Sequence, residues 1–149
     1  MVPAIRTMRK RDQDTLTNMF NITFTCKSAT HTACEKANAT FGYASDIISN
    51  VLNLNAPINV NATFMGFCQE LNDCPKRNMV ILGGASPART HLLVDNDGLK
   101  RIYPQSLVKQ FSKELHPAFA DFDIGAQFNA DANFWFPVSS MIPSFFLDI

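Results

Sequence analysis

The sequence shows no excess of charge of either sign. Its 149 residues include 13 Lys and Arg and 13 Asp and Glu, so the formal net charge is +0. These residues form neither a long basic tract nor an acidic tail. Proteins that bind nucleic acid or anionic membranes concentrate Lys and Arg on one segment or face. We therefore predict no nucleic acid partner and no membrane partner.

Long apolar runs are also missing. None approaches the roughly 18 consecutive apolar residues that span a bilayer. Basic residues occur near the N-terminus, but the apolar core of a signal peptide does not follow them. We interpret residues 1–19 as a disordered leader, or alternatively as a start that has lost its signal sequence. Residues 137–149 are expected to be a tail or the start of a truncated segment.

Familiar catalytic motifs are absent from the sequence. The three histidines, His31, His91 and His116, show no H-x(3)-H spacing, and no G-x-S-x-G occurs. Asp121 and Asp123 lie two residues apart, and a carboxylate pair can carry acid–base chemistry. On the solvent face of a strand, however, such a pair usually only increases solubility. We therefore predict no catalytic residue, no metal ligand and no cofactor in this chain.

The four cysteines form two closely spaced pairs. Seven residues separate Cys26 from Cys34, and five separate Cys68 from Cys74. Zinc knuckles place their ligands closer together, about two to four residues apart. The spacing therefore favours two local disulfides, Cys26–Cys34 and Cys68–Cys74, over a zinc site or free thiols.

Three N-x-[ST] glycosylation motifs begin at Asn21, Asn38 and Asn61. A chain rich in Asn and Thr produces one or two such motifs by chance. Together with paired cysteines they indicate an oxidising compartment. We predict N-glycans at these three residues and a secreted or extracellular protein, although no signal peptide is visible.

Alternation of apolar and polar residues predicts three strands, at residues 20–26, 58–64 and 122–128. A short buried strand is expected at residues 79–82, where a glycine pair ends it. A further strand is expected at residues 88–94. A tight turn then follows, with Gly98 at positive φ.

Apolar residues spaced by three and four positions predict two helices. The first spans residues 44–52 and the second residues 104–115. Residues 29–38 are expected to form a bridged loop with some helix. Residues 67–77 are expected to be a polar excursion that carries the second cysteine pair.

The segment 122–136 organises the predicted fold. It reads FDIGAQFNADANFWF and holds the only Trp and four of the 13 Phe. We interpret it as a strand, a polar turn at residues 129–133 and an aromatic return at residues 134–136. This hairpin-like unit needs cover on one face. The chain therefore predicts one α/β or α+β domain over residues 20–136, with a mixed, twisted sheet of about 4–5 strands and two helices on one face.

Five stretches resemble, in the same order, the region just upstream of the zinc helix in a family of secreted bacterial and fungal metalloprotease-like proteins. They are INVNATF at 58–64, LGGASP at 82–87, YPQSLV at 103–108, FDIGAQFN at 122–129 and NFWF at 133–136. In such proteins a zinc-binding H-E-x-x-H helix follows, whose Glu acts as general base. This sequence lacks that motif. The resemblance therefore transfers no zinc ligand and no catalytic residue, and zinc is expected only in a full-length relative.

The resemblance also implies a zincin-like N-terminal subdomain. Its strand before the missing helix would be the sheet edge that receives a peptide or protein substrate by β-addition. This places the substrate-facing residues at Phe128, Asn129, Asp131 and Trp135. Loss of the helix is expected to leave apolar surface beside this strand and to cause self-association.

Two functions remain open at this point. The chain is either the scaffold portion of a secreted zinc metallopeptidase-like protein, inactive as given, or a small secreted, disulfide-containing binding module without enzymatic activity. An H-E-x-x-H motif downstream would favour the first.

Overall fold

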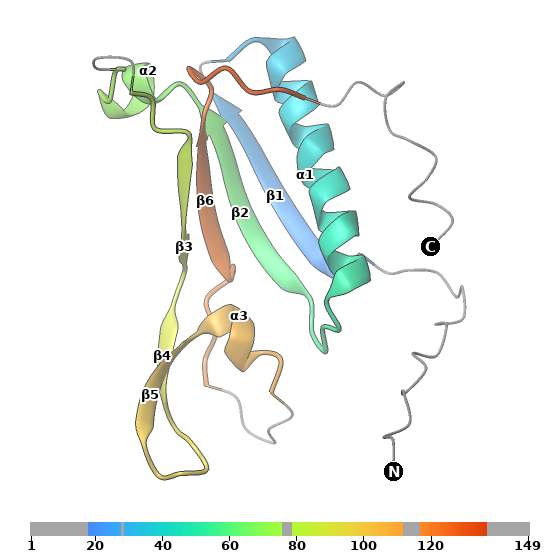
Figure 1. The fold of residues 1–149 in the computed structure, drawn as a ribbon, viewed down its shortest axis with the longest axis vertical. Coiled ribbons are helices and arrows are strands. Elements are labelled where there is room, and N and C mark those ends of the chain that lie inside the picture. Colours follow the sequence, from blue (N-terminus) through green and yellow to red (C-terminus); the bar gives the residue numbers. More distant parts are fainter. Residues whose placement is uncertain (1–17, 28, 76–78, 112–116, 137–149) are drawn as a thin grey trace, which may run out of the picture.

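The computed structural model describes residues 18–27, 29–75, 79–111 and 117–136. Their helices and strands follow one another as shown in Figure 1: β1 (Phe20–Lys27), α1 (His31–Val51), β2 (Ile58–Met65), α2 (Phe67–Leu71), β3 (Gly83–Pro87), β4 (Thr90–Val94), β5 (Lys100–Pro104), α3 (Gln105–Val108) and β6 (Ile124–Asn129). Residues 1–17 of the predicted leader (1–19), the predicted tail at 137–149 and residues 112–115 of the predicted second helix lie outside the described residues.

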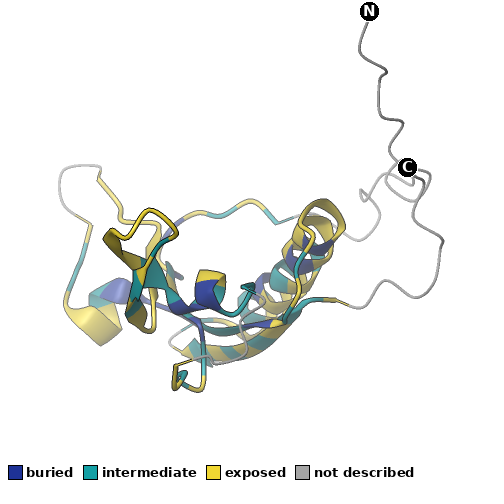
Figure 2. Ribbon diagram, turned by 90° about the horizontal axis from the view of Figure 1, so that it is seen from below, coloured by how far each residue is buried: buried dark blue, intermediate teal, exposed yellow. Residues whose placement is uncertain are grey.

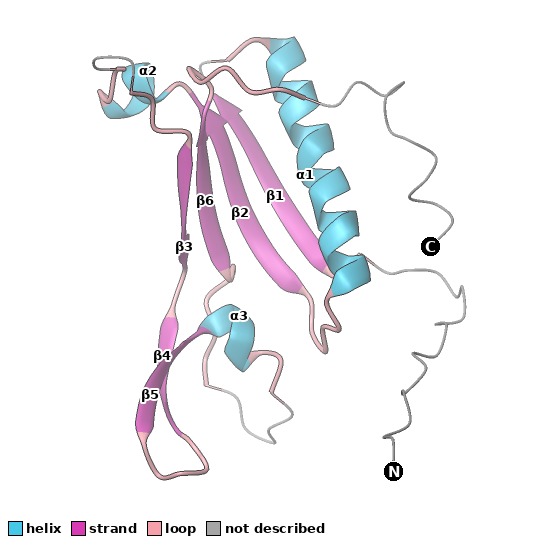
Figure 3. Ribbon diagram, viewed as in Figure 1, coloured by secondary structure: helices cyan, strands magenta, loops and turns pink. Residues whose placement is uncertain are grey.

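Four of the strands form one mixed sheet in the order β1-β2-β6-β3. β1, β2 and β6 are parallel, and β3 runs antiparallel to β6 (Figures 1 and 3). β4 and β5 pair separately as an antiparallel ribbon beyond the end of the sheet. The predicted mixed α/β fold is confirmed.

α1 connects β1 to β2 and covers one face of the sheet. Thr30 caps the N-terminus of this helix, where its hydroxyl accepts a hydrogen bond from the Ala33 N–H at 3.2 Å. Further along, the ring of Phe41 lies 5.5 Å from that of Phe24 and 5.1 Å from that of Phe128. Buried residues gather where the helix faces the strands, and its outer side is exposed (Figure 2). The apolar core thus lies between α1 and the sheet.

α1 is longer than predicted and buries a different stripe. It begins at His31, within the segment 29–38 that we expected to be mainly a loop. The apolar stripe of the predicted helix 44–52 is exposed, and Val51 is 77% exposed. Three small residues face inwards instead: Ala37, Ser45 and Ser49. The two serine hydroxyls accept hydrogen bonds from the segment before β1, a polar contact that apolar periodicity does not reveal.

The predicted strand at residues 79–82 is displaced along the chain. These residues are exposed and precede β3, which contains the glycine pair itself. A Cβ on Gly83 would lie 2.5 Å from the Gln127 carbonyl oxygen of β6. Glycine there permits close approach of the two strands. The glycine pair that was expected to end a strand is therefore part of one.

We expected β6 to be one arm of a hairpin, and the structure shows that it is not. It lies between β2 and β3, so both of its edges are already hydrogen-bonded. The aromatic return after it forms no strand. Instead, the rings of Phe134 and Phe136 pack 6.2 and 6.4 Å from that of Phe64, which is buried on the α1 side of β2.

The remaining connections differ from the predictions mainly in helix content. The segment 67–77, expected to be only a polar excursion, begins with α2. The predicted helix at residues 104–115 is helical over α3, followed by turns to residue 111. The predicted turn between β4 and β5 is confirmed, with Gly98 at φ +80°.

Both predicted disulfides are confirmed. Cys26 in β1 is bonded to Cys34 in the first turn of α1, and Cys68 is bonded to Cys74 around the end of α2. The first disulfide joins the sheet to the helix that covers it. The second closes a local loop.

Replacing Cys26 and Cys34 together with Ser is expected to lower the free energy of unfolding by about 2–3 kcal/mol, the chain-entropy value for a loop of this size. The sequence separation of 8 sets the size of that loop. Urea unfolding of the variant and the wild type measures the loss. The matched control, Ser at Cys68 and Cys74, opens a loop of separation 6 and should lose slightly less. An unfolding midpoint unchanged from the wild type would contradict the prediction.

Candidate functional site

The face of the sheet opposite α1 carries a continuous set of uncharged residues. The residues of a strand alternate between the two faces of the sheet. The register of the four strands places the residues of this face opposite one another, so that they form rows across the strands. They define the open face: Asn21, Thr23, Thr25, Asn59, Asn61, Thr63, Gly84, Ser86, Gly125 and Gln127. All except the two glycines carry a hydroxyl or an amide. Lys27, at the end of β1, is the one charged residue in these rows of the described strands.

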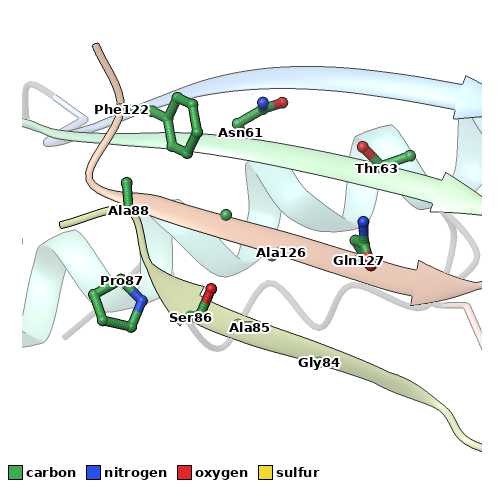
Figure 4. Close-up of a pocket in the computed structure, with 11 residues that line it drawn as sticks. Asn61, Thr63, Gly84, Ala85, Ser86, Pro87, Ala88, Phe122, Ala126 and Gln127 are labelled. Atoms are coloured by element: carbon green, nitrogen blue, oxygen red, sulfur yellow. The ribbon is translucent and has the colours of Figure 1, made fainter. Parts of the chain in front are cut away.

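Two hollows lie on the open face, and Figure 4 shows the residues that line the larger one. The larger, of about 580 Å³, is bordered by β2, β6 and β3 and includes Thr63, Ser86 and Gln127. The smaller, of about 250 Å³, lies over β1 and β2. Asn61 and Phe122 line both hollows, so these two side chains stand where the hollows meet.

The polar side chains of the open face are of two kinds. Asn21 donates from Nδ2 to the Asn59 Oδ1 at 2.9 Å, and Asn59 donates to the Asp121 carbonyl at 3.2 Å. These amides are held in place. A second group makes no side-chain hydrogen bond to any described residue and has its donors and acceptors available: Thr23, Asn61, Thr63, Ser86 and Gln127.

Phe122 supplies an aromatic ring to this polar surface. A Cβ on Gly125 would lie 3.6 Å from the Phe122 Cε2, so the ring lies over the open face at that glycine. Figure 4 shows the ring beside Asn61, with Ser86 and Gln127 on the neighbouring strands. The side chain is only half-buried. A ligand on the open face can therefore stack on it.

A buried polar network fixes the segment that carries this ring. The Asp123 Oδ2 lies 2.7 Å from the Lys109 Nζ and accepts a hydrogen bond from the Asn59 N–H at 2.8 Å. Its Oδ1 accepts a hydrogen bond from the Gln105 Nε2 at 2.7 Å. Burial would raise the pKa of the Asp123 carboxyl, but the hydrogen bonds from Lys109, Asn59 and Gln105 outweigh it and hold the pKa below its usual range.

Gln105 extends the network to the backbone on either side of Phe122. Its Oε1 accepts a hydrogen bond from the Ala120 N–H at 2.7 Å, and its Nε2 donates to the Ala120 carbonyl at 3.0 Å and to the Phe122 carbonyl at 3.2 Å. Gln105 and Lys109 lie four residues apart, on one side of the helical segment that starts with α3. That spacing is the only sequence signal for this network. The helix thus positions Phe122 through the backbone.

The prediction that Asp121 and Asp123 both lie on a solvent face is wrong for Asp123. Its side chain is 0% exposed, whereas Asp121 is exposed. The alternation of β6 begins only at Ile124, so the two carboxylates do not share a strand face. Asp123 is an anchor between α3 and β2, and its carboxylate is fully engaged by protein donors.

The predicted substrate-binding edge is also wrong. β6 is an inner strand, so Phe128 and Asn129 do not lie at a sheet edge, and a peptide cannot add beside them. Phe128 packs against Phe41 of α1. Asn129 is 1% exposed, and Asp131 accepts a hydrogen bond from the Cys68 N–H at 2.8 Å. Trp135 is 76% exposed and lines neither hollow.

The three predicted glycosylation sites lie in different settings and stay predictions. Asn38 is exposed on α1, away from the open face. Asn21 and Asn61 lie on neighbouring strands of the open face, and Asn61 lines both hollows. The side chains of these two residues differ further, because only that of Asn21 is hydrogen-bonded to a described residue.

A second group of charged side chains is paired at the turn between β4 and β5. Arg101 forms ion pairs with Asp95 and with Asp97, the latter at 2.8 Å between Nη2 and Oδ2. Hydrogen bonds from Tyr103 and Arg101 lower the pKa of Asp95. Within the described residues, no group of three or more His, Cys, Asp or Glu side chains is arranged to hold a metal ion.

Exposed apolar side chains occur in the predicted aromatic cluster and also on the β4–β5 ribbon. In the aromatic cluster after β6, the rings of Phe134 and Phe136 pack near that of Phe64, whereas Trp135 between them is 76% exposed. On one face of the β4–β5 ribbon, Leu92, Val94 and Ile102 are 63%, 58% and 69% exposed. Self-association stays a prediction, and this ribbon is the surface that would support it.

None of the helices in the described part of the chain is long and apolar enough to cross a membrane. A family profile described as SPBPB7E8-like matches residues 2–144. The chain belongs to this family. It is similar to a protein of Schizosaccharomyces pombe named "Uncharacterized protein PB7E8.01", with 36% identity over 134 residues. The match covers 84% of this chain but 24% of that relative, so the chain spans about a quarter of the relative's length. No solved structure matches.

Membership of the SPBPB7E8-like family overturns the resemblance to zinc metalloprotease-like proteins. Neither the family nor the fission yeast relative points to a zincin. The five stretches that carried the resemblance are short, and the structure explains several of them by ordinary folding. INVNATF is an alternating strand, β2, and the last five residues of LGGASP are the edge strand β3. Such patterns recur in unrelated sheets.

Proposed function

We propose that this SPBPB7E8-like chain is an extracellular, disulfide-bonded binding module that holds its ligand on the open face of the sheet. One observation carries the proposal. The four-stranded sheet is covered by α1 on one side, while the other side presents hollowed rows of uncharged amides and hydroxyls. Such groups donate and accept hydrogen bonds, and none of the residues that define the open face is a His, Asp or Glu that could activate a Ser or Thr hydroxyl as general base, which favours binding over catalysis.

The directions of the strands indicate that another molecule or segment covers the open face. Sheets of parallel strands are normally covered on both faces, whereas antiparallel sheets can expose one face to water. Here β1, β2 and β6 are parallel. A helix or sheet that covered this face as part of an apolar core would need apolar side chains to pack against. The open face carries Asn, Thr, Ser and Gln instead. A ligand that forms many hydrogen bonds fits this surface better than a packed helix does.

The disulfides support the proposed extracellular compartment. All four cysteines are paired, two of them between the sheet and the helix that covers it. Structural disulfides persist in oxidising compartments and are rare in the cytosol. This supports a secreted or cell-surface chain, and the three N-x-[ST] motifs agree with it.

A charged side chain in the middle of the open face is expected to abolish binding. Gln127 is exposed there, so Gln127→Arg is expected to fold normally while its long cation enters the larger hollow. The labelled 149-residue chain, with its disulfides intact, is applied to printed arrays of oligosaccharides and of peptides. Wild type should be retained by members of one array, and Gln127→Arg should lose at least about tenfold in signal, or roughly 1.4 kcal/mol.

The matched control is Asn50→Arg, which places the same side chain on the exposed surface of α1, away from the open face. This control should bind like the wild type. If both arrays fail to retain the wild-type chain, or if Gln127→Arg binds as well as Asn50→Arg, the open face is not the binding surface and the proposal falls.

A further inference from the structure

We infer that the ligand of the open face is a neutral carbohydrate, stacked on Phe122 and hydrogen-bonded by the residues around it. This inference rests on the proposed function and narrows it to a ligand class. Sugars carry many hydroxyl groups, each of which can donate and accept a hydrogen bond, and they also present faces of C–H groups. Recognition therefore needs amides and hydroxyls with available donors and acceptors beside an aromatic ring.

The unpaired side chains of the open face meet the first requirement. Asn61 lies opposite Thr23 on β1 and opposite Gly125 on β6, and Thr63 lies opposite Gln127. Neighbouring strands are about 4.8 Å apart, and residues on one face of a strand repeat every roughly 6.7 Å. The result is a flat lattice of donors and acceptors across three strands. A flat, hydroxyl-rich chain can engage several of them at once.

Phe122 meets the second requirement. Its ring lies over Gly125, where the absence of a side chain leaves room for it, and it borders both hollows. The backbone on either side of the ring is held by Gln105 and Asp123, both of them buried. A preorganised ring loses little entropy when a ligand stacks on it. The backbone that carries the ring is therefore positioned before the ligand arrives.

The lack of charge in the hollows selects a neutral ligand. None of the described residues that line the larger hollow is ionisable. The one ionisable residue lining the smaller hollow is Asp121, an acid. Uronates, sulfates and phosphates require Arg, Lys or a helix N-terminus, and they would be repelled by Asp121. A peptide that binds by β-addition needs a free strand edge, which lies at the outer side of β3 or of β1, whereas the hollows themselves present side chains.

The motif at Asn61 offers a second source of sugar, the chain's own N-glycan. A glycan attached to Asn61 would fill both hollows, because that side chain stands where they meet. In a strand, however, residues n and n+2 share a face, so a polar row of Asn and Thr produces N-x-T motifs by alternation alone. The inference commits to a separate glycan and requires Asn61 to be unmodified in the binding form. This departs from the sequence prediction of a glycan at Asn61.

The test applies the purified 149-residue chain to immobilised neutral polysaccharides (glucans, mannans and galactans) and acidic ones (pectate and heparin). Wild type should be retained by at least one neutral polymer and by neither acidic one. Phe122→Ala should weaken retention at least about tenfold, whereas Phe122→Trp, which keeps an aromatic face, should retain it. Trp135→Ala removes an exposed aromatic side chain that lines neither hollow, so it serves as the control and should bind normally. Thermal unfolding of each variant confirms that it folds.

Three results would overturn the inference. Retention only by acidic polymers would show that charge governs binding. Retention only by peptides, still lost in Gln127→Arg, would leave the open face as the binding surface but exclude a carbohydrate ligand. Mass spectrometry showing full N-glycan occupancy at Asn61 in the secreted protein would mean that the chain's own sugar covers the face. Partial occupancy, with retention confined to the unmodified fraction, would support the inference.

Discussion

Replacing Asp123 with Asn is expected to lower the free energy of unfolding by about 3–5 kcal/mol, because loss of one partner leaves the other charge of a buried pair uncompensated. The Asp123 side chain is 0% exposed, and its Oδ2 lies 2.7 Å from the Nζ of Lys109, whose side chain is 15% exposed. The Asn side chain also keeps only one of the two oxygens, so either the Gln105 Nε2 or the Asn59 N–H loses its hydrogen-bond acceptor. Urea unfolding at neutral pH, followed by circular dichroism, measures the loss.

Asp121→Asn is the matched control for this substitution. The chemical change is the same, two residues earlier, at an exposed carboxylate that forms no ion pair with any described residue. Surface changes of this kind alter stability by at most about 0.5 kcal/mol. Similar losses in the two variants would show that Asp123 contributes no more than a surface carboxylate does.

The same ion pair predicts how stability depends on pH. The folded-state pKa of Asp123 lies below its value in the unfolded chain, about 3.9. Its contribution is therefore fully present above that pH and is lost as the pH falls through the folded pKa. The stability difference between wild type and Asp123→Asn should stay constant from about pH 7 to about pH 5 and shrink below about pH 4. A difference that shrinks near neutral pH would assign the titration to another group.

Replacing Asn129 with Ala is expected to lower the free energy of unfolding by about 2–3 kcal/mol, since each buried polar group left without a partner costs about 1–3 kcal/mol. The Asn129 side chain is 1% exposed. It accepts a hydrogen bond from the Phe67 N–H at 3.1 Å and donates one to the Ile81 carbonyl at 2.8 Å. It thereby ties the end of β6 to the start of α2 and to the chain that enters β3. Urea unfolding again provides the measurement.

Asn133→Ala is the control for Asn129→Ala, because Asn133 is exposed and no described residue hydrogen-bonds its side chain. Its stability should stay within about 0.5 kcal/mol of the wild type. Folded Asn129→Ala should still bind on the open face, since Asn129 lines neither hollow. If Asn129→Ala had normal stability but no longer bound the ligand, Asn129 would contact the ligand instead of stabilising the fold.

The strands and disulfides were predictable because their signals are local. β1 and β2 begin where alternation begins, and each extends one residue beyond its predicted end. The cysteine pairs could be assigned because each half lies close to its partner along the chain. α1 and β3 were harder to predict for opposite reasons. α1 buries Ser45 and Ser49 through hydrogen bonds, and β3 depends on glycine, which usually indicates a turn.

The candidate site was only partly visible in the sequence. The polar residues of β1 and β2 stood out as the outward half of an alternating pattern, and Asn21 and Asn61 were singled out as glycosylation sites. Nothing in the sequence joined them to Gln127 or Ser86. The role of Phe122 was missed as well, because Gln105 and Asp123, 18 residues apart, combine to hold it.

By itself, the sequence determined that this protein is a disulfide-bonded α/β chain with alternating strands and without net charge. These properties depend on composition and on residues within a few positions of one another. Only the tertiary structure decided that β6 is an inner strand, that Asp123 is buried and that four polar rows form one face. Strand order and register bring together residues far apart in the chain, such as Asn61 and Gly125. Local periodicity in the sequence indicates which face of a strand a side chain lies on, but it does not indicate which strand is the neighbour of that strand in the sheet.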